Sequence, residues 1–347
     1  MGNCSRDQKQ HAQKQGQIVF QAIEGLIDSS YPPPDMSDID VLVVGSIAYD
    51  TISTPAGSIE DGIGGSATYG SLASSFHSKL INGGDVALVG VVGNDFKESD
   101  LEIFSKSGIK TNGLEIAEGE TFRWSGSYHG SMAEAKTHDT KLNVFEFFNP
   151  KVPGEHSKPQ ITFCANLHPS IQKSVLEQSQ PERITMLDSM NLWIDIARDD
   201  LVDVLSKVDL VILNDGEIKM LAGSDNLLQA CEDVRNSTGA SILVVKKGEH
   251  GVLAWHDSGL ISLPAFPTKN LTDPTGCGDT FAGTIAARLA QGSGDISIQE
   301  LREALIHATV TASFTLESFS INRLFELDQE EYNSRVAEYK NIVFGQD

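Results

Sequence analysis

Short, uninterrupted runs of apolar side chains recur along the chain from residue 41 onward. They span residues 41–44, 86–92, 161–165, 184–187, 210–213 and 242–245. Such runs are typical of strands that are buried on both faces. The stretches between them have apolar residues at helical spacing, at 64–76, 95–108, 169–178, 195–206 and 225–237. Strands that alternate with helices predict βαβ units, and hence a three-layer α/β fold with a mainly parallel central sheet.

Two stretches interrupt this alternation. Residues 46–62 carry several small and turn-forming residues with little helical pattern, and residues 113–147 alternate apolar and polar side chains, most clearly at 121–125 and 142–146. A period of two predicts β structure, so we expect a small β lid outside the main sheet. Toward the C-terminus, residues 276–291 and 301–316 predict two helices joined by a short link.

The first 39 residues differ from the body at 40–347. Their apolar residues fall at helical spacing between Val19 and Ile27, and consecutive prolines follow at 32–34. Proline ends helices and stiffens the chain. The pattern predicts an N-terminal extension, made of a short amphipathic helix and a proline-rich linker, ahead of one large domain.

Charge and cysteine content limit the classes of partner and the location that the sequence favours. There are 26 lysines and arginines against 48 aspartates and glutamates, which gives a net charge of −22. An acidic surface repels phosphate backbones and anionic lipid, so we expect neither nucleic acid nor membrane as a partner. The four cysteines form no Cys-x-x-Cys pair, and no apolar run has the length of a membrane helix. A reducing, cytoplasmic location fits this cysteine usage.

The segment at residues 273–283, Asp-Pro-Thr-Gly-Cys-Gly-Asp-Thr-Phe-Ala-Gly, carries the clearest chemistry. Gly276 and Gly278 permit a tight turn and leave backbone N–H groups uncovered just before a predicted helix. Such N–H groups at a helix N-terminus bind anions, including a phosphoryl group in transfer. Asp279, in the first helical turn, is placed either to accept the proton of an attacking hydroxyl or only to cap the helix.

This segment resembles the C-terminal signature of the ribokinase/PfkB carbohydrate kinase family. The resemblance implies that Asp279 is the catalytic base and that the backbone of Gly276, Cys277 and Gly278 forms the anion hole. Cys277 stands where the family more often has Ala. Because the anion hole consists of backbone groups, a small Cys side chain is compatible with it.

The resemblance extends over roughly residues 40–325, and its N-terminal motifs concern the phosphoryl acceptor. Residues 45–50 resemble the family's opening strand, whose final acidic residue, here Asp50, holds the acceptor's hydroxyls. Gly64 and Gly65 resemble the di-glycine that lets the backbone approach the acceptor. Residues 91–96 resemble the family's Val-Gly-x-Asp-x-Phe motif.

The later motifs concern the nucleotide. Asn214-Asp-Gly-Glu217 resembles the family's Asn-x-x-Glu, which implies that Asn214 contacts the nucleotide and that Glu217 holds Mg²⁺, directly or through water. Helix capping is the alternative role for both residues. Residues 244–251 resemble the strand and loop that border the nucleotide, where Gly248 is the candidate. Thr275 is a second candidate for nucleotide binding, whereas Lys246 is interpreted as a solvated charge.

Several positions bear on the identity of the acceptor. Tyr69 stands four residues past Gly65, where many sugar kinases of the family have Asn, and the lost amide argues against ribose itself. Its ring either packs in a helix or stacks on a base or sugar. Arg123 in the predicted lid either contacts a phosphate or charged acceptor or is simply exposed. Asp188 and Asn191 follow a predicted strand, where α/β sheets bind ligands, but a turn explains them equally well.

The resemblance implies an ATP-dependent phosphotransferase that acts on a hydroxyl of a sugar, sugar derivative or nucleoside. It implies Mg²⁺, and a monovalent cation near Asp273 as in relatives. An exposed lid edge would allow a homodimer. One alternative is a non-catalytic ligand-binding protein on the same fold, although an intact 276–279 segment argues against it. Another is a dinucleotide-binding oxidoreductase, since residues 62–67 match Gly-x-Gly-x-x-Ala, although a polar segment separates them from the preceding strand.

Overall fold

The computed structural model describes residues 39–345. The extension predicted for residues 1–39 therefore lies outside the described residues except for Ile39, which begins the first strand. Its helix and linker, and the division of the chain at residue 39, stay predictions. Within residues 39–345, no helix combines the length and the apolar character needed to cross a membrane.

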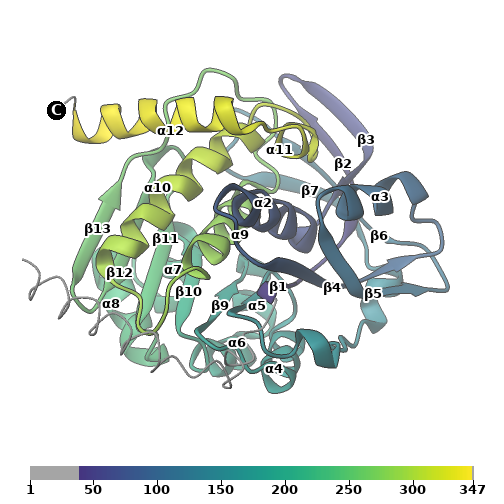
Figure 1. Ribbon diagram of the computed structural model, residues 1–347, viewed down its shortest axis with the longest axis horizontal. Helices are drawn as coiled ribbons and strands as arrows, with labels where there is room; N and C mark the ends of the chain where they lie inside the picture. The colour runs from purple at the N-terminus through teal and green to yellow at the C-terminus, as the bar shows by residue number, and fades with distance from the viewer. Residues whose placement is uncertain (1–38, 346–347) are drawn as a thin grey trace, which may run out of the picture. The chain divides into compact units, whose positions relative to one another are not determined.

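A nine-stranded sheet forms the centre of the domain (Figure 1). Its strands are β1 (Ile39–Val44), β4 (Asp85–Gly93), β5 (Ile109–Ala117), β8 (Ile161–Cys164), β9 (Ile184–Asp188), β10 (Leu210–Asn214), β11 (Ile242–Lys246), β12 (Val252–His256) and β13 (Gly259–Leu263). They are ordered β13-β12-β11-β10-β9-β8-β1-β4-β5, and only the pairs made by β12 and β13 are antiparallel. Each predicted apolar run forms one of these strands, so the predicted, mainly parallel α/β fold is confirmed.

Helices cover both faces of this sheet. One face carries α2 (Ser66–Leu80), α3 (Glu98–Lys106), α9 (Cys277–Leu289), α10 (Ile298–Thr315), α11 (Asn322–Phe325) and α12 (Gln329–Phe344). The other carries α4 (Pro169–Gln178), α5 (Asn191–Ile196), α6 (Arg198–Leu205), α7 (Asp215–Ala222) and α8 (Leu227–Thr238). Val41 and Val43 of β1 belong to the first core, and Leu42 and Val44 to the second. Burial on both faces is why the apolar runs are uninterrupted.

A separate four-stranded sheet contains β2 (Ala48–Thr54), β3 (Gly57–Gly64), β6 (Phe122–Tyr128) and β7 (Ala135–Lys141), in the order β3-β2-β6-β7. These strands lie in the two stretches for which the sequence indicates β structure outside the main sheet. That this second sheet acts as a lid stays a prediction.

Two boundaries of the predicted lid are wrong. Residues 113–117 belong to β5 of the main sheet. Residues 142–146, predicted as β structure, lie mostly in the 3₁₀ helix η1 (Asn143–Phe147). Aromatic packing favours this turn, because Phe145 stacks on Phe122 with ring centroids 5.1 Å apart and on Phe148 at 5.9 Å. Two further 3₁₀ helices are η2 (Gly154–His156) and η3 (Gly248–His250).

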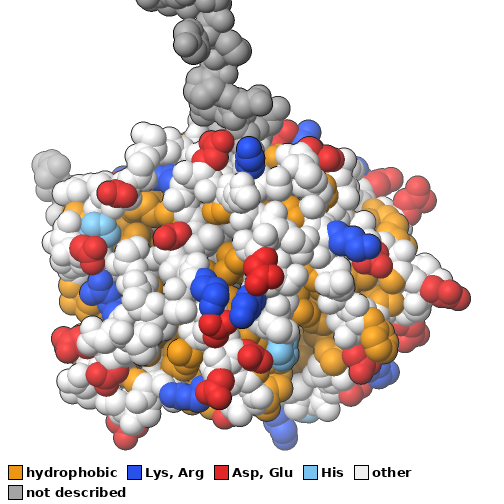
Figure 2. All heavy atoms as spheres, turned by 90° about the horizontal axis from the view of Figure 1, so that it is seen from below, with side chains coloured by type: hydrophobic (Ala, Val, Ile, Leu, Met, Phe, Trp, Pro, Cys, Tyr) orange, Lys and Arg blue, Asp and Glu red, His pale blue; other side chains and the backbone are white. Residues whose placement is uncertain are grey.

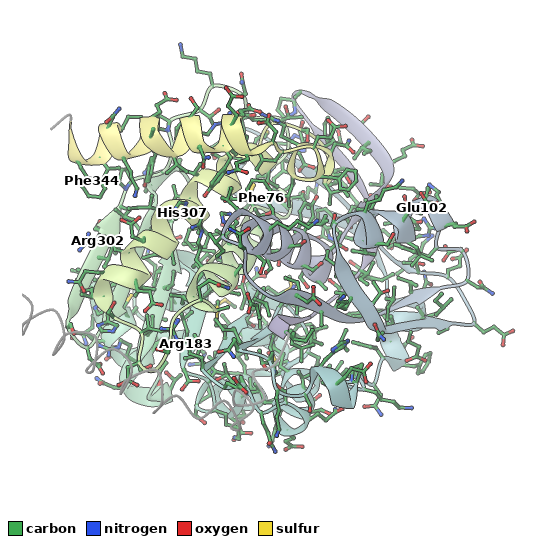
Figure 3. All side chains as sticks on the ribbon, in the orientation of Figure 1. Phe76, Glu102, Arg183, Arg302, His307 and Phe344 are labelled. Atoms are coloured by element: carbon green, nitrogen blue, oxygen red, sulfur yellow. The ribbon has the colours of Figure 1, made fainter. Side chains whose placement is uncertain are left out.

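The C-terminal helix α12 was not predicted from the sequence. Its buried residues are only Tyr332 and Tyr339, on an otherwise polar helix, so its apolar periodicity is weak. Tyr332 lies 5.2 Å from Phe76 of α2, ring centroid to centroid, and its Oη is 2.5 Å from Nδ1 of His307 on α10. Figure 3 labels Phe76 and His307 on these two helices. Contacts between distant segments therefore hold α12 in place.

The acidic side chains are dispersed over the face drawn in Figure 2. Carboxylates there alternate with lysines and arginines instead of gathering in one area. Several exposed charged side chains of residues 39–345 form ion pairs, such as Lys173 with Asp203 at 2.8 Å. Exposed pairs of this kind contribute little stability, so the chief effect of the acidic surface is on solubility and on repulsion of other anions.

Candidate active site

Three adjacent strands of the main sheet end in polar residues. β9 ends at Asp188, β10 at Asn214 and β11 at Lys246. The strands are parallel, so these residues lie at one edge of the sheet, where α/β proteins bind ligands. Lys246 Nζ forms an ion pair with Asp188 Oδ2 at 2.6 Å, and the two side chains are only 19% and 4% exposed. A buried ion pair at this edge is the first component of the site.

The N-terminus of α9 lies against this pair. Gly276 is the N-cap and has a left-handed backbone with φ of 76°. A Cβ at Gly276 would also collide with the ring of Tyr69, so glycine is required here on two grounds. A Cβ at Gly278 would lie 3.1 Å from Lys246 Nζ, which places the ammonium beside the first turn of the helix.

The predicted anion hole and base occupy that turn. Cys277, Gly278 and Asp279 are its first residues, and the N–H of Cys277 donates to the Pro274 carbonyl at 3.2 Å. Burial, with a further contribution from the Asp188 carboxylate, raises the pKa of Asp279 to about 7, although Lys246 opposes this shift. A carboxyl group with a pKa near 7 is well matched to general base catalysis at neutral pH.

Lys246 is largely buried and paired with Asp188, although the sequence pattern predicts a solvated charge at this position. Burial lowers its pKa, but the carboxylates of Asp188 and Glu217 more than offset this, so its pKa lies above the usual value and it carries a positive charge. The available signal was its position, at the end of a fully apolar run and two residues before Gly248. Asp188, noted in the sequence as a strand-end residue, is its partner.

Most of the predicted acceptor residues lie near Asp50, whereas Arg123 lies with Asp61 and Asp95. Asp50 is on β2 and 6% exposed, and a Cβ at Gly64 would collide with its carboxylate. Gly65, with φ of 95°, would collide with the Ser46 carbonyl if it had a Cβ. Burial, followed by repulsion from Asp273 and Asp279, raises the pKa of Asp50 to about 8. The two glycines thus allow close packing around a buried carboxyl group.

Two polar atoms near this carboxyl group are buried without a hydrogen-bond partner in the described part of the chain. They are Tyr69 Oη and Asp273 Oδ2. Tyr69 is 1% exposed, and burial, with Asp50 and Asp273 as the next contributors, raises its pKa well above the ordinary value. Its hydroxyl is therefore protonated at neutral pH. Buried polar groups without partners are costly, which is typical of sites that bind polar ligands.

Asn214, predicted to contact the nucleotide, and Glu217, predicted to hold Mg²⁺, together form a helix cap. Asn214 Oδ1 accepts from the Glu217 N–H at 2.8 Å, and Glu217 Oε2 accepts from the Asn214 N–H at 2.7 Å. Burial raises the pKa of Glu217 to about 7 against the opposing effect of Lys246. Within residues 39–345, no three His, Cys, Asp or Glu side chains are grouped to hold a metal by themselves. The donor type of Glu217, a carboxylate, is one that Mg²⁺ accepts, with phosphate and water as its other ligands.

The other predicted site residues have different surroundings. Gly248 begins η3 with φ of 52°, and no other part of the described chain lies within 4 Å of the position that a Cβ would take. The Thr275 hydroxyl donates to Tyr128 Oη at 3.2 Å and so links the second sheet to the loop before α9. Arg123 forms ion pairs with Asp61 at 2.5 Å and Asp95 at 2.7 Å. A contact of Gly248 or Thr275 with nucleotide, or of Arg123 with the acceptor, stays a prediction.

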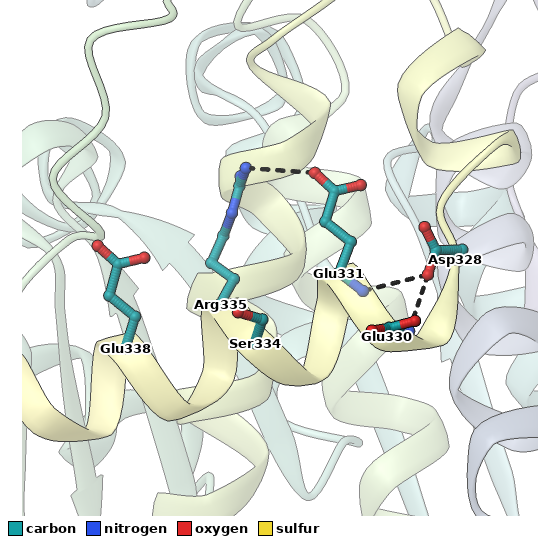
Figure 4. Close-up of a pocket in the computed structure, with 6 residues that line it drawn as sticks. All are labelled: Asp328, Glu330, Glu331, Ser334, Arg335 and Glu338. Carbon is teal, nitrogen blue, oxygen red and sulfur yellow. Dashed lines mark hydrogen bonds and ion pairs between the residues drawn. The ribbon is translucent and has the colours of Figure 1, made fainter.

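A surface pocket on α12 shares no residue with this site. Figure 4 shows its lining, which is Asp328, Glu330, Glu331, Ser334, Arg335 and Glu338. Asp328 caps the helix by accepting from the Glu330 and Glu331 N–H groups at 2.8 and 3.1 Å. Capping accounts for Asp328, and ion pairs for Glu331 and Arg335.

The dinucleotide-binding alternative does not fit the structure. Residues 62–67 join β3 of the second sheet to α2, whereas the fingerprint requires a strand of the parallel sheet that runs directly into a helix.

Comparisons with known proteins agree with the geometry. Residues 174–325 match the model of the pfkB family of carbohydrate kinases. The chain is 28% identical over 260 residues to the cytidine kinase of Thermococcus kodakarensis, which covers 73% of this chain and 90% of the relative. The nucleoside kinase of Methanocaldococcus jannaschii, an archaeal member of the ribokinase family, has the same fold, with a TM-score of 0.68 and 19% identity. The match covers 86% of this chain and 99% of that kinase. The nucleoside kinase of Burkholderia thailandensis in complex with inosine has a TM-score of 0.69 at 17% identity. This match covers 88% of this chain and 99% of that kinase. Residues 174–325 are thus similar to the pfkB family of carbohydrate kinases, the relative found over most of the chain is a kinase, and the chain is a phosphotransferase with the ribokinase-like fold.

Proposed function

We propose that this kinase transfers the γ-phosphoryl group of ATP to a hydroxyl of a sugar or nucleoside, with Asp279 as the catalytic base. The observation that carries the proposal is the position of Asp279. It lies in the first turn of α9, beside the Lys246–Asp188 pair, with a pKa raised to about 7. Relatives that are named cytidine kinase, fructokinase and inositol 3-kinase support an alcohol as the acceptor.

Each group has a separate task in the proposed reaction. Asp50 accepts hydrogen bonds from acceptor hydroxyls, and Asp279 takes the proton of the attacking hydroxyl. The first-turn N–H groups of α9 and the Lys246 ammonium stabilise the negative charge of the phosphoryl group in transfer. Asn214 contacts the nucleotide, and Glu217 would hold Mg²⁺, directly or through water, which would supply additional charge neutralisation at the phosphates. The second sheet would exclude water, which otherwise competes with the acceptor.

Two further parts of the proposal concern a monovalent cation and a homodimer. Asp273 Oδ2 is buried without a hydrogen-bond partner among the described residues, and it is the candidate ligand of a monovalent cation. β7 is an edge strand of the second sheet with every residue exposed, and it is the candidate surface for a homodimer.

The activity is expected to depend on pH through Asp279. The base must be ionised, and its pKa is raised to about 7, so kcat/KM should rise with pH through about 7 and continue to rise to about 8, where the Asp50 carboxyl group also ionises. The check is a pH profile of kcat/KM at constant ionic strength and saturating Mg²⁺. A profile that is flat from pH 5 to 8 would contradict a base with a raised pKa.

Asp50→Asn is expected to raise KM for the acceptor by about tenfold or more, with little change in ATP affinity, because it weakens only the hydroxyl contacts. Steady-state kinetics with each substrate varied in turn measures both effects. Loss of ATP binding would contradict the placement of the acceptor site.

Asp50→Asn should also change how the stability of the protein depends on pH. The pKa of Asp50 in the folded protein is about 8, above its ordinary value of 3.8. Ionisation of Asp50 therefore disfavours folding increasingly as pH rises from about 4 to about 8. Asn removes this penalty, so the melting temperature of the variant relative to wild type should be higher at pH 8 than at pH 5.

A further inference from the structure

Asp50 of β2 shares one face of the second sheet with residues of the neighbouring strand β6. β2 and β6 pair in parallel, with Asp50 opposite Trp124 and Ile52 opposite Gly126. Residues in register, and those two positions apart, share a face of a sheet. Trp124 accordingly packs with Ile52 and Tyr128. Arg123 is on the other face, with its guanidinium 5.2 Å from the ring centroid of Tyr49.

The indole of Trp124 is held across this face. A Cβ at Gly126 would collide with two atoms of its six-membered ring and lie 3.1 Å from a third, so the ring covers the glycine. The indole Nε1 donates to Thr137 Oγ1 of β7 at 3.2 Å, which fixes the orientation of the ring. Trp124 nevertheless remains partly exposed. A ring supported in this way is a flat platform beside the acceptor carboxylate.

The chemistry around the platform is mostly apolar. Ile52, Tyr128, Met132 and Phe319 belong to the same cluster as Trp124, and Asp50 adjoins it as a carboxyl group. A free sugar has hydroxyl groups around its ring, each of which needs a polar partner once it is bound. A nucleoside has hydroxyls at one end and a flat aromatic base at the other, which matches a carboxylate next to an indole.

We infer that the acceptor is a nucleoside whose ribose hydroxyls bind Asp50 and whose base stacks on Trp124. This inference rests on the proposed function and specifies its acceptor. Stacking of a base on an aromatic side chain changes affinity by about ten- to a hundredfold when the ring is removed. Trp124 is thus a specificity-determining residue, and its effect is on binding of the acceptor.

Fluorescence provides a direct test without ATP. The chain has three tryptophans, so a Trp193→Phe/Trp255→Phe variant leaves Trp124 as the only one. Titration with cytidine or inosine should quench its emission in a saturable manner, and titration with ribose or fructose should not. Quenching by the sugars alone, or by none of these compounds, would overturn the inference.

Kinetics tests the same residue during turnover. Trp124→Ala should lower kcat/KM for the nucleoside about ten- to a hundredfold, and Trp124→Phe should lower it less, because a smaller ring still stacks. Gly126→Val retains the indole but displaces it, and should also raise KM for the nucleoside. Phe147→Ala is the control, since that ring is 82% exposed and lies outside this face, and it should leave kinetics unchanged. Unchanged kinetics in both Trp124→Ala and Gly126→Val would overturn the inference.

The outcomes separate this inference from the proposed function. Phosphorylation of sugars but not nucleosides, abolished by Asp279→Asn, would overturn the inference and leave the proposed function intact. Saturable quenching by nucleosides without phosphorylation of any acceptor would support nucleoside binding at Trp124, but would contradict the proposed function and the role of the nucleoside as its acceptor. Nucleoside phosphorylation that depends on both Trp124 and Asp279 would support both.

Discussion

Asp279→Asn is expected to lower kcat by about 10²–10⁴-fold while the affinity for ATP stays nearly constant. The amide has the shape of the carboxylate but cannot accept the proton of the attacking hydroxyl. Single-turnover kinetics measures the chemical step, and isothermal titration with a non-hydrolysable ATP analogue measures nucleotide binding. A loss of both together would point to damage of the anion hole instead of loss of the base.

The helix-capping alternative for Asp279 predicts a different result. A capping side chain contributes about 0.5–2 kcal/mol of stability and no chemistry. Asp279→Asn would then leave turnover near that of wild type. Asp199→Asn is a matched control, because Asp199 is also in the first turn of a helix, α6, but is exposed and outside the site.

Lys246→Met is expected to lower kcat/KM by about 10²–10³-fold, as is typical when a group that stabilises transition-state charge is removed. The ammonium lies beside Gly278 in the first turn of α9, where the phosphoryl group is proposed to bind. The variant also leaves the buried Asp188 without its counter-ion, which costs about 3–5 kcal/mol in comparable buried pairs.

A double-mutant cycle separates these two effects. Asp188→Asn in the Lys246→Met background removes the uncompensated charge, so the double variant should regain most of the lost stability. If Lys246 acts on the phosphoryl group, activity should stay low in the double variant. Recovery of both activity and stability would mean that Lys246 only balances the charge of Asp188. Lys173→Met, which breaks the exposed pair with Asp203, controls for loss of a lysine charge.

The match to the pfkB family confirms the resemblance that the sequence indicates, and with it the kinase class. The roles of individual site residues stay predictions that the variants above test. Grouping of Asp50, Tyr69, Gly276 and Asp279 in one place is a finding of the structure, since contacts and charge effects link these residues.

The sequence by itself determined the features that depend on local chemistry. The strands of the parallel sheet follow from apolar runs, because burial on both faces leaves no polar position within them. The turn before α9 follows from Gly276 and Gly278, because only glycine tolerates the backbone and the close contacts there. Such signals are contained in a few neighbouring residues.

Only the tertiary structure decided the features that depend on distant partners. Lys246 differs from a solvated lysine because Asp188, 58 residues away along the chain, lies 2.6 Å from it in a buried setting. Arg123 and Trp124 are adjacent in sequence, yet the pleat of β6 directs one toward aspartates and the other toward the face of Asp50. The helix α12 is held by Tyr332 against α2 and α10 and not by its own periodicity. The burial, the charge environment and the face of each of these side chains are properties of contacts that form only when the chain has folded.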